Sequence, residues 1–279
     1  MIRYGMDAAY SELKKIRTSA ANIDSELKEI ASQGQNLTPS ITSLLTPPML
    51  SVLLVGIGLG LFQQFSGVNA IMYYGPVIFK SAGFVLVRHA ILATFLIGII
   101  NVIFTLVTLY YVDRFGRRFL LLSGTLIAAF SLFATSLLFH LNPPGQRTWI
   151  LCSLSLYIMG YCISVGSLFW VIISEIFPLR IRSLAMSIAT AAQWGANFIV
   201  SISFLEIYYA MGDCFIFSLF ACICLTAFVF VYYFIPETTA VSLEKIEENL
   251  TAGKKIRDIG QRFNNKKKSR FKLIMDKTS

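Results

Sequence analysis

Long apolar stretches separated by short polar breaks dominate the chain, and this pattern predicts a helical membrane protein. Six apolar segments follow one another, at residues 49–79, 89–112, 119–140, 149–176, 183–209 and 213–235. Each is long enough to cross a bilayer, which takes about 20 residues in a helix. Because backbone polar groups find no water in lipid, each segment should be helical. The short breaks predict antiparallel neighbours in one bundle.

Polar segments flank this bundle on both sides. In the lead, residues 10–16 and 25–30 have the spacing of short amphipathic helices. The tail is rich in lysine and arginine, and we expect it to be disordered and attracted to anionic headgroups. A solvated tail that only helps topology remains the alternative. The chain therefore divides into a cytoplasmic linker (1–48), a six-helix transmembrane bundle (49–236) and a basic cytoplasmic tail (237–279).

The distribution of lysine and arginine predicts the orientation of the bundle. Basic residues are concentrated in the lead, in the loops at 113–118 and 178–182, and in the tail. The opposite side carries only Lys80, Arg88 and Arg147. Since cytoplasmic loops carry the excess of positive charge, both termini should be cytoplasmic. We expect a multi-pass protein of the plasma (inner) membrane that contacts membrane lipids.

Composition excludes several classes of protein. The chain is 56% hydrophobic and 14% charged, whereas soluble domains have about 25% charged residues. The net charge of +9 does not indicate nucleic acid, because the basic residues lie in loops and tails rather than in a patch with interleaved aromatics. Cys222 and Cys224 lack the further ligands of a metal site. His89 and His140 stand alone, so no enzyme, metal or cofactor is predicted.

The first apolar segment contains a polar run, Gln63-Gln64-Phe-Ser-Gly-Val-Asn69. An amide without a partner in hydrocarbon costs several kcal/mol, so these side chains should face a wet cavity or a ligand. On an ideal helix Gln64 and Asn69 lie roughly 140° apart. The helix must therefore bend or unwind for both to reach one cavity, and Gly67 permits this. A polar contact between helices is the alternative.

Later segments supply further polar and aromatic residues at membrane depth. Asn101 lies in the second segment and Trp170 in the fourth, while Gln193, Trp194 and Asn197 lie in the fifth. Amides donate and accept hydrogen bonds, and flat aromatic faces stack on sugar rings. This combination favours a neutral polyhydroxylated ligand. No cluster of carboxylates or arginines within the segments indicates an ion as the main substrate.

Five motifs, in order and spacing, resemble those of the sugar porters of the major facilitator superfamily, and most closely those of bacterial sugar–proton symporters. They are Gln63-Gln64-Phe-Ser-Gly-Val-Asn69 with Tyr73-Tyr74, Asp113-Arg-Phe-Gly-Arg117-Arg118, Glu175-Ile-Phe-Pro178 with Arg180-Ile-Arg182, Ala191-Ala-Gln193-Trp194, and Pro236-Glu237-Thr238. The resemblance implies an all-α integral membrane fold that corresponds to the C-terminal half of a major facilitator. It also implies transport of a monosaccharide (hexose or pentose) by sugar–proton symport and alternating access.

The resemblance also implies roles by position. Substrate contacts fall on Gln63, Gln64, Asn69, Asn101, Trp170, Gln193 and Trp194. Tyr73 and Tyr74 fall at an outer gate. A cytoplasmic charge network that holds the outward-facing state falls on Asp113, Arg117, Glu175, Arg182 and Glu237.

The sequence departs from the family pattern in two respects. Family members often carry Gly-Pro before the tryptophan of the fourth segment, whereas Gly166 is followed here by Ser167-Leu-Phe169. This predicts an unbroken helix. The transporters also have two six-helix halves, and this chain holds one. The expected partners are therefore a monosaccharide, protons and a separate N-terminal half. A non-transporting sugar sensor or adaptor, or an inactive truncated remnant, is the alternative.

Overall fold

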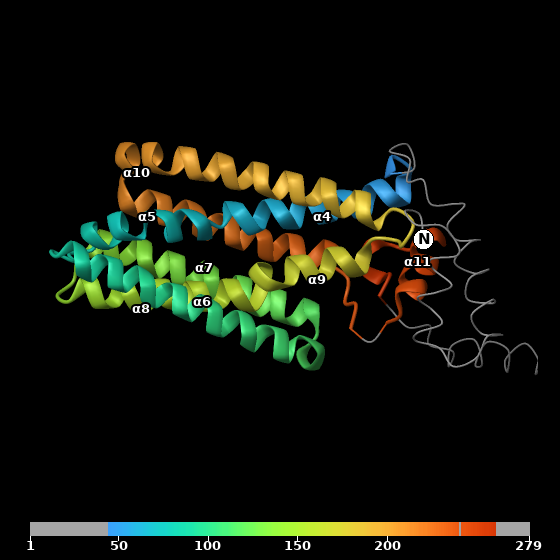
Figure 1. Cartoon of the computed structure of the whole chain (residues 1–279), viewed down its shortest axis with the longest axis horizontal. Coiled ribbons are helices and arrows are strands. Elements are labelled where there is room, and N and C mark those ends of the chain that lie inside the picture. Colours follow the sequence, from blue (N-terminus) through green and yellow to red (C-terminus); the bar gives the residue numbers. More distant parts are fainter. Residues whose placement is uncertain (1–43, 240, 261–279) are drawn as a thin grey trace, which may run out of the picture.

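A computed structural model describes residues 44–239 and 241–260, and in this part of the chain the fold is all-α, as predicted. Long helices run side by side along the axis of one elongated bundle (Figure 1). The elements are α4 (Pro47–Phe65), α5 (Val68–Ser81), α6 (Val87–Phe115), α7 (Arg117–Leu141), α8 (Gln146–Tyr161), η1 (Cys162–Gly166), α9 (Ser167–Ile176), α10 (Arg182–Phe234), α11 (Leu243–Thr251) and η2 (Ile256–Asp258).

The first apolar segment is interrupted at Gly67, which confirms the predicted bend. Gly67 adopts a left-handed conformation (φ 88°) between α4 and α5, and glycine does this without steric cost. The ring of Phe220 fills the space beside it, so that a Cβ atom at Gly67 would lie 2.4 Å from a ring carbon. Both the backbone conformation and the packing therefore require glycine here.

The fourth apolar segment is also interrupted, and the predicted unbroken helix was wrong. The five residues of η1 form a π-helical turn between α8 and α9, in which Ser164 has a non-helical conformation (φ −109°, ψ −117°). The hydroxyl of Ser164 donates to the carbonyl of Gly160 at 2.7 Å. A Cβ on Gly124 of α7 would lie 2.5 Å from the same carbonyl oxygen. Close packing of small residues thus accompanies the break, which needs no proline.

The predicted fifth and sixth segments are joined in α10. A straight helix of 53 residues would be about 80 Å long, far more than the roughly 30 Å hydrocarbon core. Gly212 breaks it with a non-helical conformation (φ 81°, ψ 170°). Phe204 and Phe220, equally distant from Gly212, have ring centroids 6.3 Å apart, so the two arms fold back on each other. Within the described residues, five helical stretches are long and apolar enough to span a membrane, and the count of six stays a prediction.

Packing places α7 at the centre of the bundle, against α8 and α10, while α4 packs against α10 and α5 against α6. The helix α6 lies at the periphery. Only Ala90, Ala93, Ile97, Thr108 and Val112 of its residues are buried. Its outward face is strongly apolar, which is typical of a surface in lipid or against another membrane helix.

The start of the tail is ordered against the end of the bundle. Ser242 caps α11 by accepting a hydrogen bond from the backbone N–H of Lys245. The amide of Asn249 donates to the carbonyl of Ile259 at 2.7 Å. The predicted disorder was therefore wrong for residues 254–260. The amphipathic helices predicted at 10–16 and 25–30, and the basic residues beyond 260, lie outside the described residues.

We expect Gly67→Ala to lower the free energy of unfolding by roughly 3 kcal/mol, because a left-handed alanine and an overpacked contact each cost energy. Gly98→Ala is the matched control, since nothing lies within 4 Å of a Cβ at that position of α6. Denaturation of both purified variants in detergent measures the difference. Equal stability of the two variants would contradict the assignment of Gly67 as the required break.

Candidate functional site

Gln63 connects three parts of the bundle at mid-depth. Its side chain is 3% exposed, and its Nε2 donates to the carbonyl oxygens of Val165 and Gly166, each at 3.0 Å. Its Oε1 accepts a hydrogen bond from Nε2 of Gln193 at 3.1 Å. The carbonyls belong to η1, where the break removes regular helical partners. Gln63 thereby links α4 to the fourth segment and to α10.

The bend at Gly67 brings a second set of amides together. Nδ2 of Asn69 donates to Oε1 of Gln64 at 2.8 Å and to Oδ1 of Asn197 at 3.0 Å. Gln64 and Asn69, which lie on different sides of an ideal helix, are therefore in direct contact. The polar run predicted instead that both would reach one cavity. Asn197 was not among the predicted substrate contacts. It follows Gln193 by four residues, which places both on the same face of α10.

A cavity of about 330 Å³ opens beside this amide network. It contains two predicted residues, Asn69 and Asn101, from α5 and α6. Its other walls are Val68, Met72, Thr105, Tyr161, Cys162 and Gly166. Its volume is within the range of small-molecule sites, about 300–1,000 Å³. Thr105 and Tyr161 were missed in the sequence, although Thr105 lies one helical turn from Asn101 and Tyr161 is a polar aromatic at membrane depth.

Two buried polar atoms near this region have no hydrogen-bond partner among the described residues. They are Oε1 of Gln193 and Oγ of Ser167. A buried carbonyl oxygen without a partner costs about 1–3 kcal/mol, so a donor from outside the chain is favourable here. A hydroxyl of a ligand or a water molecule supplies such a donor.

The predicted aromatic residues lie in two different environments. Trp170, Trp194 and Tyr73 are 43%, 57% and 57% exposed, and none of them lines the cavity. Tyr74 is partly buried: its hydroxyl donates to the carbonyl of Ser201 at 3.0 Å. The structure therefore brings the predicted amides together but not the tryptophans, whose contact with substrate stays a prediction.

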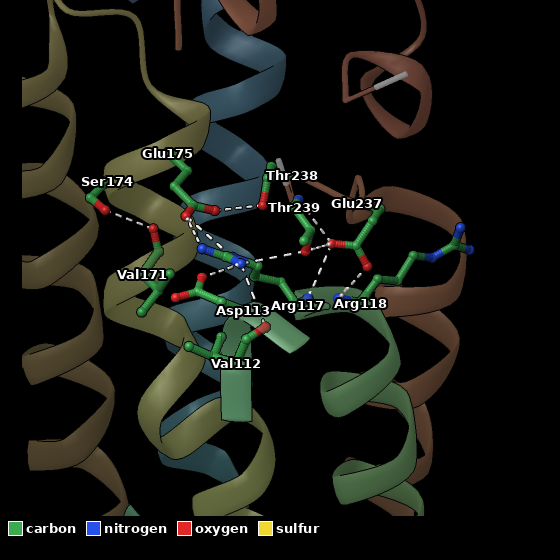
Figure 2. Close-up of polar contacts among 10 residues, drawn as sticks. All are labelled: Val112, Asp113, Arg117, Arg118, Val171, Ser174, Glu175, Glu237, Thr238 and Thr239. Carbon is green, nitrogen blue, oxygen red and sulfur yellow. Dashed lines mark hydrogen bonds and ion pairs between the residues drawn. The ribbon is translucent and has the colours of Figure 1, made fainter. Parts of the chain in front are cut away.

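At one end of the bundle, Arg117 lies between two carboxylates (Figure 2). Its guanidinium is 2.8 Å from Asp113 and 2.9 Å from Glu175. The side chains of Arg117 and Glu175 are 11% and 19% exposed, whereas that of Asp113 is 79% exposed. Solvent screening makes the Asp113 pair worth little. Glu175 is the carboxylate whose loss would leave Arg117 partly buried without a comparable partner.

Glu237, which follows α10, joins the same cluster. Its carboxylate accepts hydrogen bonds from the backbone N–H groups of Arg117 and Arg118, each at 3.1 Å, and from Thr239. These N–H groups are the first of α7, where the helix leaves donors unpaired and favours negative charge. The adjoining Thr238 donates its hydroxyl to Glu175. The segment 237–239 therefore joins α7 and α9, the helices that carry Arg117 and Glu175.

Hydrogen bonding sets the charge of Glu237. Burial raises the pKa of its carboxyl, but the hydrogen bonds from Thr239 and from the amides of Arg118 and Arg117 outweigh this. The pKa of Glu237 is consequently below its ordinary value of 4.5. Glu237 is ionised at neutral pH and holds the cluster in that form.

Arg182 does not join this cluster in the structure. Its Nε donates to the carbonyl of Phe177 at 3.1 Å, beyond the end of α9. This contact stabilises the turn between α9 and α10. A role of Arg182 in a charge network stays a prediction.

Comparison with known proteins connects these features to transport. Residues 3–250 match the sequence profile of a family described as "Sugar (and other) transporter". The galactose-proton symporter of Escherichia coli K12 is 36% identical over 208 residues, which are 74% of this chain and 45% of that protein. The D-xylose-proton symporter of the same organism is 36% identical over 206 residues, 71% of this chain and 41% of the other. These relatives are transporters rather than enzymes.

Solved structures give the same result for the fold. The proton:xylose symporter XylE bound to 6-bromo-6-deoxy-D-glucose superposes with a TM-score of 0.70 at 32% identity, over 86% of this chain and 50% of the other. An inward-open structure of the xylose transporter XylE from E. coli superposes with a TM-score of 0.65 at 31% identity, over 87% and 49% of the two chains. The chain thus spans about half the length of the relatives it matches.

The stabilising effect of Glu237 should depend on pH. Because its folded-state pKa is depressed, its contribution is present above the unfolded value of about 4.5 and is lost as the pH falls through the folded value. We expect Glu237→Gln to lower stability by roughly 1–2 kcal/mol at pH 7 and to have a shrinking effect below pH 4.5. Denaturation of both proteins between pH 3.5 and 7 measures this. A difference that is constant with pH would contradict the assigned role of the charge.

Proposed function

Because the chain belongs to the sugar transporter family of the major facilitator superfamily, we propose that it carries one side of a monosaccharide pathway. In this proposal it moves a hexose or pentose by alternating access, in symport with protons and together with a second six-helix half. The contact of Asn69 with Gln64 and Asn197 beside the 330 Å³ cavity is the observation that carries the proposal. A monosaccharide substrate is supported by the relatives, which are named as symporters of galactose and D-xylose.

The chemistry of the cavity suits a neutral sugar. Asn101 and Asn69 present amides that donate and accept hydrogen bonds, and Thr105 adds a hydroxyl. Oε1 of Gln193 lacks a hydrogen-bond partner among the described residues, but it is buried and does not line the cavity. Among the residues that the structure describes, no carboxylate, lysine or arginine lines the cavity, so a charged substrate would lack a counter-ion there.

The Arg117 cluster has the properties of an inner gate. It ties α7, α9 and the segment after α10 through one guanidinium and two carboxylates, Glu175 and Glu237. Opening of this end requires these partly buried pairs to separate, which makes the closed arrangement a discrete state. We assign the cluster to the cytoplasmic side, with both termini in the cytoplasm of a plasma (inner) membrane, from the bias of lysine and arginine.

A test of the proposal is radiolabelled xylose and galactose uptake into vesicles. The chain is expressed alone and then together with an N-terminal six-span half of a family relative. We expect uptake only with both halves, because alternating access requires one half to rock against another. Uptake by the chain alone would refute the need for a partner. Sugar binding without flux in either case would favour a sensor or adaptor, and neither binding nor flux would favour a remnant.

Within the co-expressed pair, Asn101→Ala should reduce uptake about 5-fold, because one amide contact to the sugar is worth about 1 kcal/mol. The matched control is Asn142→Gly. It also removes an amide, but from a loop residue whose left-handed conformation (φ 47°) glycine adopts readily. Initial rates at low sugar concentration and surface expression of each variant complete the measurement. Equal rates for the two variants would remove Asn101 from the site.

A further inference from the structure

A second cavity lies at the end of the bundle, away from the amide network. Its volume is about 710 Å³. Its walls come from the start of α7, the end of α10 and the segment that follows α11. The described residues that line it are Arg118, Tyr233, Phe234, Glu237, Lys255, Ile256, Arg257, Asp258 and Gly260. The transport proposal uses only Glu237 of these residues.

Three cations from two distant parts of the sequence meet in this cavity: Arg118, Lys255 and Arg257. Arg118 points away from the Arg117 cluster (Figure 2). Its Nη2 donates to the carbonyl of Tyr232 at 2.6 Å, while its Nε is buried without a hydrogen-bond partner in the described part of the chain. The protein therefore leaves this guanidinium incompletely satisfied.

The other two cations are exposed and lack carboxylate partners. Neither Lys255 nor Arg257 forms an ion pair within the described ranges. Arg257 lies over the ring of Tyr232 with its guanidinium carbon 5.1 Å from the ring centroid. Arg118 lies over the same ring at 5.5 Å. Both guanidinium groups therefore contact the same aromatic ring, and an anion in the cavity would interact favourably with both.

Two carboxylates also line the cavity, so the excess of positive charge is modest. Glu237 accepts hydrogen bonds from the amides of Arg117 and Arg118 and from Thr239, which already compensate its charge. Asp258 opposes the three cations as a second carboxylate. The balance favours an anion that contacts the arginines directly rather than a diffuse cloud of counter-ions.

The cavity is placed at the level of the membrane surface. Tyr232, Tyr233 and Phe234 are the last residues of α10, and they are 43%, 59% and 48% exposed. Tyrosines at the end of a spanning helix are typical of the headgroup region. An anionic group in this cavity could therefore belong to a lipid or come from the aqueous phase.

We propose that this cavity binds the phosphate group of a phosphomonoester at the membrane surface, with Arg118, Lys255 and Arg257 as its ligands. Arginine presents a planar fork of donors that matches phosphate oxygens, and lysine adds a point charge. Phosphatidic acid and a soluble sugar or glycerol phosphate share this chemistry. The site is independent of the sugar pathway, so its test does not require transport.

The test is a titration of the purified full-length chain in neutral detergent, followed by thermal unfolding. The probes are phosphatidic acid, glycerol 3-phosphate and, as a zwitterionic control, phosphatidylcholine. The double variant Lys255→Gln/Arg257→Gln is compared with Lys80→Gln/Arg88→Gln, which removes two exposed cations at the opposite end of the bundle and keeps the basic tail. All four substituted residues are exposed, so both variants should fold.

We expect the apparent Kd of the phosphomonoester to rise about 30-fold in Lys255→Gln/Arg257→Gln, because each cation near the membrane surface contributes about 1 kcal/mol. Lys80→Gln/Arg88→Gln should bind as the wild type does. Stabilisation by phosphatidic acid alone identifies a lipid site, and equal stabilisation by glycerol 3-phosphate identifies a soluble ligand. The same titration for both double variants, stabilisation by phosphatidylcholine, or no stabilisation by either phosphomonoester would overturn the proposal.

Discussion

The middle of this bundle depends on one constraint: polar groups buried away from water must form hydrogen bonds within the protein. Each interruption of a helix in hydrocarbon frees carbonyl groups, and each unpaired group costs several kcal/mol. The fourth segment is interrupted at η1, and the side-chain amide of Gln63 donates hydrogen bonds to the freed carbonyls of Val165 and Gly166. At the interruption beside Gly67, the hydroxyl of Tyr157 donates to the carbonyl of Ser66 at 2.9 Å. The amides are thus part of the fold as well as of the cavity wall.

This double use has a consequence for function. The side-chain amide of Gln63 forms three hydrogen bonds within the protein. In this state it therefore positions the fourth segment and Gln193 and is not free to bind a ligand. Asn101 is more available because it lines the cavity, whereas Oε1 of Gln193 is buried and has no hydrogen-bond partner among the described residues. The same principle operates at the end of the bundle, where Glu237 takes up the unpaired N–H groups of α7. Each network joins separate helices of the bundle, and the proposed inner gate opens when the second network separates.

The sequence permitted the prediction of features that follow from local chemistry. The polar run implied a bend at Gly67, and the family resemblance implied a charge network that includes Arg117, Asp113 and Glu175. It could not reveal η1, because that break depends on the contact of Gly124 with Gly160 across two helices. Exposure of Trp170 and Trp194 likewise depends on how α9 and α10 rotate in the bundle. The ordered start of the tail rests on contacts such as that of Asn249 with Ile259.

In the proposed function, Asn101 and Asn69 face a water-filled sugar cavity. The most direct test is the rate at which a water-soluble maleimide labels Asn101→Cys when the second half is present. The background replaces the five native cysteines by serine, because Cys162 lines the same cavity and would itself be labelled. We expect the cysteine to be labelled, and xylose or galactose to slow the labelling in a concentration-dependent way. A cysteine at this position that does not react, or that reacts equally fast with and without sugar, would contradict it.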